Sequence, residues 1–214
     1  DRAYYDGKKN YGTQGYSAFD FEDGYSSNGM YYCNGKGGEN RRCLILKNVK
    51  AGDIVTFYAR ISNSGDEKIH FASINDDGTK NGAQDEVAPL TAVSTKYSYI
   101  ATTSGTYKVY ADNSVGKPVY YRIVRTPGVE VKGNLASIPS GKAAIKFVVK
   151  ETKQEIQGKI TGKSYSVGLP AGYTFTAVLT GIKGYGINAQ TKTIVLDKSA
   201  TGSVKKDLTV AEQK

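Results

Sequence analysis

Histidine, tryptophan and cysteine are scarce in this 214-residue chain, which has one histidine, no tryptophan, two cysteines and one methionine. A single histidine excludes His-rich metal sites and zincin motifs. No nucleophile motif accompanies His70, so we expect the protein to have no enzymatic activity. The alternative is a small hydrolase, which would need carboxylates that converge in a cleft. No apolar run approaches the roughly 18 residues of a membrane-spanning helix, and we therefore expect no membrane insertion.

The charge and the tyrosines are divided unequally along the chain. The formal net charge of +9 splits into +2 for residues 1–128 and +7 for residues 129–214. All six arginines and fourteen of the seventeen tyrosines lie in the first part. The more basic part is thus the one poor in aromatic rings for base stacking, and nucleic acid is not an expected partner. The two compositions predict two domains, at residues 1–127 and 128–214.

Helical periodicity is absent, and short alternating runs broken by Gly, Asn and Asp recur along both parts. This pattern predicts an all-β chain of two tandem β-sandwich domains. The strands expected in the first domain are Ala18–Glu22, Arg42–Leu46, Asp53–Ser62, Lys68–Ile74, Lys96–Thr102, Gly105–Ala111 and Pro118–Arg125. Those expected in the second are Val129–Leu135, Ala143–Glu151, Gln154–Ile160, Ser164–Leu169, Thr174–Gly181, Gln190–Leu196 and Gly202–Val210. Residues 24–41 and 75–95 are expected to form long loops.

Two small groups of residues predict a disulfide bond and a metal site. Cys33 and Cys43 are close in the sequence, and we expect them to form a disulfide, with two thiols as the alternative. Asp20, Glu22 and Asp23 cluster on the expected first strand, and such carboxylates suit a structural calcium ion. The alternative is ordinary acidic loop chemistry, and no other cofactor is expected.

Basic and tyrosine side chains alternate with the expected core positions on three strands of the first domain. Tyrosine rings stack on the C–H faces of sugars, and Arg or Lys pairs with the carboxylate of a uronic acid. The alternative is that the tyrosines pack under loops or satisfy β propensity. If the strands are neighbours in one sheet, the predicted ligand-binding residues are Tyr58, Arg60, Lys108, Tyr110, Tyr120 and Arg122.

Several segments have a familiar pattern. Residues 17–126 resemble the non-catalytic β-sandwich modules of secreted clostridial pectate lyases and related polysaccharide-degrading enzymes. The resemblance is carried by Phe19–Gly24, Ala51–Tyr58, Thr103–Tyr110 and Gly116–Ile123. It implies a jelly-roll-like first domain in a secreted or surface-exposed bacterial protein, joined covalently to a larger enzyme.

The second domain is similar to carboxypeptidase-regulatory-like and transthyretin-like Ig modules through Gly162–Val167 and Leu169–Phe175. It is also similar to the B-type repeats of Gram-positive collagen adhesins. That likeness offers Lys146 and Asn188 as an isopeptide pair, although the acidic residue expected in the Tyr165–Leu169 region is absent.

Together these features predict a monomeric, non-catalytic carbohydrate-binding tandem. Its expected ligand is plant cell-wall polysaccharide rich in uronic acid, above all pectin or homogalacturonan. The alternative is a cell-surface adhesin or stalk segment with a structural or protein-binding role.

Overall fold

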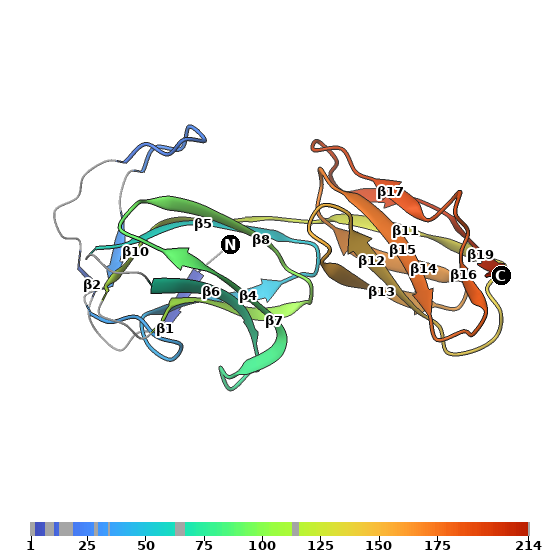
Figure 1. Ribbon diagram of the computed structural model, residues 1–214, viewed down its shortest axis with the longest axis horizontal. Helices are drawn as coiled ribbons and strands as arrows, with labels where there is room; N and C mark the ends of the chain where they lie inside the picture. Colours follow the sequence, from blue (N-terminus) through green and yellow to red (C-terminus); the bar gives the residue numbers. More distant parts are fainter. Residues whose placement is uncertain are drawn as a thin grey trace. The chain divides into compact units, whose positions relative to one another are not determined.

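The computed structural model describes residues 3–6, 11–12, 19–27, 30–33, 35–62, 67–112 and 116–213 (Figure 1). The described residues contain strands, turns and bends but no helix, which confirms the predicted all-β class. No helix long and apolar enough to cross a membrane therefore occurs among them. The chain divides into two compact units. The first comprises Asp1–Val49, Val55–Tyr99 and Ser104–Thr126, and the second comprises Lys50–Ile54, Ile100–Thr103 and Pro127–Lys214.

The first unit contains two five-stranded sheets, with strand orders β1-β4-β9-β6-β7 and β2-β3-β10-β5-β8. The strands are β1 (Ala3–Asp6), β2 (Tyr11–Gly12), β3 (Tyr31–Cys33), β4 (Cys43–Val49), β5 (Ile54–Ile61), β6 (Glu67–Ile74), β7 (Lys80–Leu90), β8 (Thr95–Ile100), β9 (Gly105–Ala111) and β10 (Pro118–Thr126).

The core of the first unit lies where side chains of the two sheets meet. Phe71 of β6 stacks on Tyr99 of β8 with ring centroids 5.7 Å apart, and also on Tyr107 of β9 at 4.5 Å. The alternation of apolar with other residues in the sequence explains which face of a strand is buried. In β5, Val55, Phe57, Ala59 and Ile61 are all fully buried, as the period-two pattern predicts.

Three expectations for the first unit need correction. Asp20–Glu22 is not a strand, because Asp20 makes only an isolated bridge with Ser26; Ala18 lies outside the described residues. Residues 75–95 are not a loop, since β7 runs through them and pairs with β6 from Leu90 to Lys80. Residues 24–41 contain β3, although residues 28, 29 and 34 are not described.

The second unit is built on one continuous set of paired strands in the order β16-β19-β11-β14-β13-β12-β15-β17, with β18 paired to β11. The strands are β11 (Val129–Ala136), β12 (Ala144–Val149), β13 (Glu155–Thr161), β14 (Ser164–Leu169), β15 (Thr174–Thr180), β16 (Tyr185–Ile187), β17 (Thr193–Val195), β18 (Ser203–Lys205) and β19 (Leu208–Glu212).

One apolar cluster fills this unit, and Phe147 and Phe175 are fully buried in it. The residues offered as an isopeptide pair have other partners. Lys146 Nζ donates to Glu155 Oε1 at 2.6 Å, and Asn188 Oδ1 accepts from the Gln190 amide at 2.8 Å.

Candidate functional site

Residues Phe19–Ser27, called the strap here, form a short turn that packs on side chains of β5, β8 and β10. Its two ends are tied together, since the Ser27 amide donates to the Phe19 carbonyl and the Phe19 amide donates to Ser27 Oγ, at 2.9 and 3.0 Å. Gly24 has a φ of 83° and its amide donates to the Phe21 carbonyl. A glycine adopts this left-handed conformation without steric cost, so the chain can reverse there.

Aromatic rings attach the strap to the sheet below it. Phe21 is the centre, with ring centroids 4.7 Å from Tyr58 and 5.5 Å from both Tyr25 and Tyr121. Phe21 and Tyr58 are buried by this contact, at 7% and 4% exposed. Arg122 adds a cation–π contact, with Cζ 4.7 Å from the Tyr25 ring centroid. The strap therefore covers Tyr58 instead of leaving its ring open to a ligand.

Asp23 is the polar anchor of the strap. Its Oδ2 accepts a hydrogen bond from the Tyr58 hydroxyl and pairs with Lys96 Nζ, both at 2.7 Å. The hydrogen bonds from Lys96 and then Tyr58 lower the pKa of Asp23 to about 2. Burial and the hydrogen bond to Asp23 raise the pKa of Tyr58 to about 12. Both shifts keep the carboxylate ionised and the phenol protonated at neutral pH.

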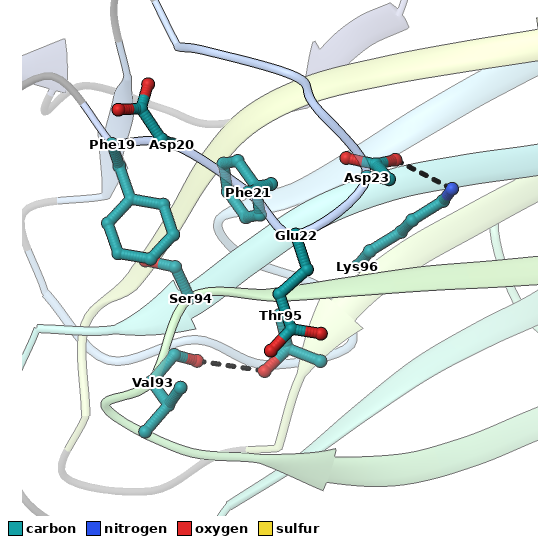
Figure 2. Close-up of a pocket in the computed structure, with 9 residues that line it drawn as sticks. All are labelled: Phe19, Asp20, Phe21, Glu22, Asp23, Val93, Ser94, Thr95 and Lys96. Atoms are coloured by element: carbon teal, nitrogen blue, oxygen red, sulfur yellow. Dashed lines mark hydrogen bonds and ion pairs between the residues drawn. The ribbon is translucent and has the colours of Figure 1, made fainter.

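A pocket of about 390 Å³ opens between the strap and the start of β8. Figure 2 shows the Phe19 ring and the Glu22 side chain on one side, with Val93, Ser94 and Thr95 facing them. Phe19 and Val93 are large apolar residues that remain exposed, at 36% and 68%. The lining set is Phe19, Asp20, Phe21, Glu22, Asp23, Val93, Ser94, Thr95 and Lys96.

This pocket combines hydroxyl groups with the partly exposed ring of Phe19, which packs on Phe21 and Tyr121 with centroids 4.7 and 6.2 Å apart. The Thr95 hydroxyl donates to the Val93 carbonyl at 3.0 Å, and the Ser94 hydroxyl donates to the Tyr121 hydroxyl at 3.2 Å. Their remaining lone pairs can accept further hydrogen bonds. With Lys96 paired to Asp23, the carboxylates of Asp20 and Glu22 give the lining a surplus of negative charge. An uncharged, hydroxyl-rich ring fits such a pocket better than an anion.

The six residues predicted to bind ligand do not share one sheet. Tyr58 and Arg60 on β5, with Tyr120 and Arg122 on β10, lie in the sheet that the strap covers. Arg60 Nε donates to the Tyr121 hydroxyl at 2.7 Å, and Tyr120 is only 2% exposed. Arg122 is the exposed member of this group.

Lys108 and Tyr110, the other two, lie on β9 in the opposite sheet and are buried. Lys108 is 2% exposed, and its Nζ donates to the Gly78 carbonyl at 2.7 Å and to Asn40 Oδ1 at 3.4 Å. Tyr110 is 4% exposed and stacks on the His70 ring with centroids 4.5 Å apart. The prediction that all six residues form a single surface is therefore wrong. Lys108 instead bonds to the loops that contain Gly78 and Asn40, and Tyr110 packs on His70 of its own sheet.

His70 belongs to a polar network that the sequence analysis did not predict. Its Nδ1 lies 2.9 Å from Asp85 Oδ1 and its Nε2 lies 2.7 Å from Asp112 Oδ1, while Lys80 Nζ pairs with Asp85 at 2.9 Å. Each ring nitrogen of His70 therefore faces a carboxylate oxygen at hydrogen-bond distance. Cross-strand register brings these residues together, and sequence spacing carries no signal for it.

Two of the three acidic residues predicted to bind calcium, Asp20 and Asp23, have other partners. Asp20 Oδ1 accepts from the Ser26 hydroxyl at 2.6 Å, Asp23 is held by Lys96 and Tyr58, and Glu22 is exposed. Within the described ranges, no three His, Cys, Asp or Glu side chains converge on a point that could hold a metal ion. The geometry gives the calcium prediction no support, and it stays a prediction.

The predicted disulfide is not present, because Cys33 and Cys43 are two buried thiols. They lie in different sheets, Cys33 at the end of β3 and Cys43 at the start of β4. The Cys33 thiol is directed to the Arg42 carbonyl, at 4.0 Å. Both side chains act as small apolar groups of the core.

No protein-family model matches this sequence, and no curated protein matches it significantly. The resemblance of residues 17–126 to carbohydrate-binding modules and that of the second unit to Ig-like modules therefore stay predictions.

Proposed function

We propose that this protein is a non-catalytic carbohydrate-binding protein that holds plant cell-wall polysaccharide, with pectin as its preferred polymer. The pocket beside Phe19 carries the proposal. A sugar ring placed there stacks its C–H face on the phenyl ring and bonds through its hydroxyls to Ser94, Thr95 and Glu22. Because the lining has a surplus of negative charge, this subsite takes neutral or methyl-esterified residues of the polymer.

The position of the histidine supports a non-catalytic role. His70 is the only histidine of the chain, and Asp85 and Asp112 engage both its nitrogens on the sheet opposite the pocket. It is thus not directed at a sugar bound beside Phe19. From the resemblance come two further proposals: the protein is secreted or surface-exposed, and it is covalently part of a larger polysaccharide-degrading enzyme. That it is a monomer is a separate proposal.

Affinity gel electrophoresis of the full chain tests this function. We expect retardation by highly methyl-esterified pectin, compared with xylan and β-glucan in parallel gels. Phe19→Ala should weaken the retardation at least about threefold through loss of the stacking face. Phe19→Leu serves as a second variant, because it keeps apolar packing on Phe21 while removing the ring.

Two valines provide a matched control, since Val93 lines the pocket and Val195 lies in the second unit at nearly equal exposure, 68% and 67%. Val93→Ser should weaken pectin binding, whereas Val195→Ser should leave it unchanged. Absence of retardation by every wall polysaccharide would refute the function. Binding that is equal in both valine variants and in Phe19→Leu would place the site elsewhere.

A further inference from the structure

Three lysines form a row across the outer face of the second unit. Lys205 of β18 is the register partner of Lys132 of β11, Lys132 is the partner of Ser166 of β14, and Ser166 is the partner of Lys159 of β13. Figure 1 labels β11, β14 and β13, which are neighbours in this order. Lys205, Lys132 and Lys159 are called the lysine row here. With neighbouring strands roughly 4.8 Å apart, the row spans on the order of 14 Å.

Packing does not account for this arrangement. The residues next to the row on these strands, Val131, Tyr165 and Val167, are buried in the core, so the three lysines belong to the opposite, outer face. Like charges on paired strands destabilise a sheet. Among the described residues, the row has partial compensation from Glu130 at 3.2 Å from Lys132 and from Asp207 at 3.7 Å from Lys205. These side chains are more than half exposed, and ion pairs at such exposure stabilise little.

A second row, of neutral polar groups, lies two residues further along the same strands. Asn134 of β11 is the register partner of Ser164 of β14, which is the partner of Thr161 of β13. The Ser164 hydroxyl donates to Asn134 Oδ1 at 3.3 Å. A pocket of about 370 Å³ lies over two lysines of the row, Lys132 and Lys205, and over the neutral row, and Lys159 lies outside its lining. The lining residues are Lys132, Gly133, Asn134, Thr161, Ser164, Tyr165, Ser166 and Lys205.

The lysines of this pocket suit an anionic ligand, and its aromatic content indicates which kind of anion fits. Its one aromatic residue, Tyr165, is 2% exposed, and its hydroxyl donates to the Lys206 carbonyl at 2.6 Å. The ring thus offers no face on which a nucleic-acid base could stack. What the surface offers is ammonium groups in a line beside hydroxyl and amide groups.

We propose that the lysine row is a second subsite, which binds a linear carboxylated polysaccharide, that is, a run of uronate residues. The three ammonium groups pair with successive carboxylates, and Asn134, Ser164 and Thr161 bond to the sugar hydroxyls. This deepens and rests on the proposed function. The neutral or esterified residues of pectin go to the Phe19 pocket of the first unit, and the ionised residues go to the second unit.

Isothermal titration of the full chain with a galacturonate hexamer tests this subsite. The row variant carries Lys132→Gln, Lys159→Gln and Lys205→Gln. Its matched control carries Lys150→Gln, Lys183→Gln and Lys192→Gln, which are exposed and lie on none of β11, β13, β14 and β18. Both variants lose the same charge. We expect the row variant to bind the hexamer about fivefold to tenfold more weakly, with a smaller salt dependence, and the control to change less than twofold.

Equal weakening in both variants would show that the hexamer is attracted by the net charge of the protein alone, and this would overturn the proposal. Equal affinity for dextran sulfate or for single-stranded polynucleotide would overturn its specificity for carboxylated sugars. The two proposals fail separately. A chain that binds esterified pectin through Phe19 but shows no heat with the hexamer refutes the lysine row and leaves the proposed function standing. Hexamer binding that survives Phe19→Ala and is lost in the row variant supports the row independently of the pocket.

Discussion

Lys96 Nζ lies 2.7 Å from Asp23 Oδ2, and this ion pair connects the strap to β8 at the edge of the candidate pocket. The same carboxylate oxygen accepts a hydrogen bond from the Tyr58 hydroxyl. One aspartate therefore joins the strap, β5 and β8. The pocket wall depends on that aspartate being ionised.

The first prediction concerns acid. The pKa of Asp23 is lowered from the ordinary 3.8 to about 2 by its partners. The stabilisation is therefore complete above pH 4 and is lost as the pH falls from about 4 to about 2. Asp23→Asn should reduce the unfolding temperature at pH 7 and abolish this acid-dependent part. Glu22→Gln, at the neighbouring exposed position, is the control, and thermal unfolding at pH 7, 4 and 2 is the measurement. Parallel pH curves for Asp23→Asn and the unmodified chain would contradict the assignment.

The second prediction concerns the ring at the centre of the strap. Phe21→Ala removes contacts with Tyr25, Tyr58 and Tyr121 at once, and should cost about 3 kcal/mol in urea unfolding. Tyr25→Phe removes only a hydroxyl whose bond to the Tyr121 carbonyl is long, at 3.4 Å, and should cost less than about 1 kcal/mol. Similar losses for the two variants would show that the strap is not anchored by Phe21.

How far the sequence predicts this structure depends on how local each feature is. The alternation of Val55, Phe57, Ala59 and Ile61 is local, and it predicts both β5 and its buried face. The strand β7 is missed because Lys80–Leu90 contains Gly82 and Pro89 and many polar residues, which are typical of a loop. It is an edge strand, and such residues are tolerated at an edge.

The candidate site is predicted less well for the same reason. Which strands are neighbours is a property of the whole chain, so spacing did not reveal that Lys108 and Tyr110 lie on the sheet opposite Tyr58 and Arg60. The sequence pattern places Phe19 in a strand, whereas the hydrogen bonds between Phe19 and Ser27 and the isolated bridge between Asp20 and Ser26 fold this segment back as a strap. The lysine row likewise depends on register between strands.

The third prediction concerns the His70 network. His70→Phe retains a ring to stack on Tyr110 but removes the bonds to Asp85 and Asp112, and we expect a loss of about 1–3 kcal/mol. Burial raises the pKa of Asp85, but the bonds from His70 and Lys80 outweigh it and lower the pKa overall. The His70→Phe variant should therefore titrate Asp85 at higher pH, which carboxylate NMR can measure. Lys47→Gln, an exposed lysine on β4, is the control; an unchanged Asp85 titration in His70→Phe would contradict the coupling.

The fourth prediction concerns a carboxylate that is costly to ionise. Glu67 is 6% exposed, and burial raises its pKa, although the Gly116 amide donates to its Oε1 and opposes this. A raised pKa means that stability is greatest below the ordinary value of 4.5 and falls as the pH rises through the folded value. Glu67→Gln should therefore stabilise the protein at pH 7 and match it at pH 4. If Gln destabilises at pH 7, the ionised form is the one that the fold favours.

The last prediction concerns the backbone beneath the lysine row. A Cβ at Gly133 would meet the Lys206 carbonyl, whose oxygen accepts from Tyr165, and the Lys206 amide donates to the Lys132 carbonyl at 2.9 Å. Gly133→Ala must therefore push the segment after β18 away from β11, which moves Lys205 relative to Lys132. We expect a lower unfolding temperature and weaker binding of the galacturonate hexamer, with pectin retardation through Phe19 unchanged. Gly162→Ala, where a Cβ meets nothing within 4 Å but φ is 60°, controls for conformational strain in the same unit. A Gly133→Ala variant that loses stability yet keeps full hexamer affinity would show that the spacing between β18 and β11 does not govern the lysine row.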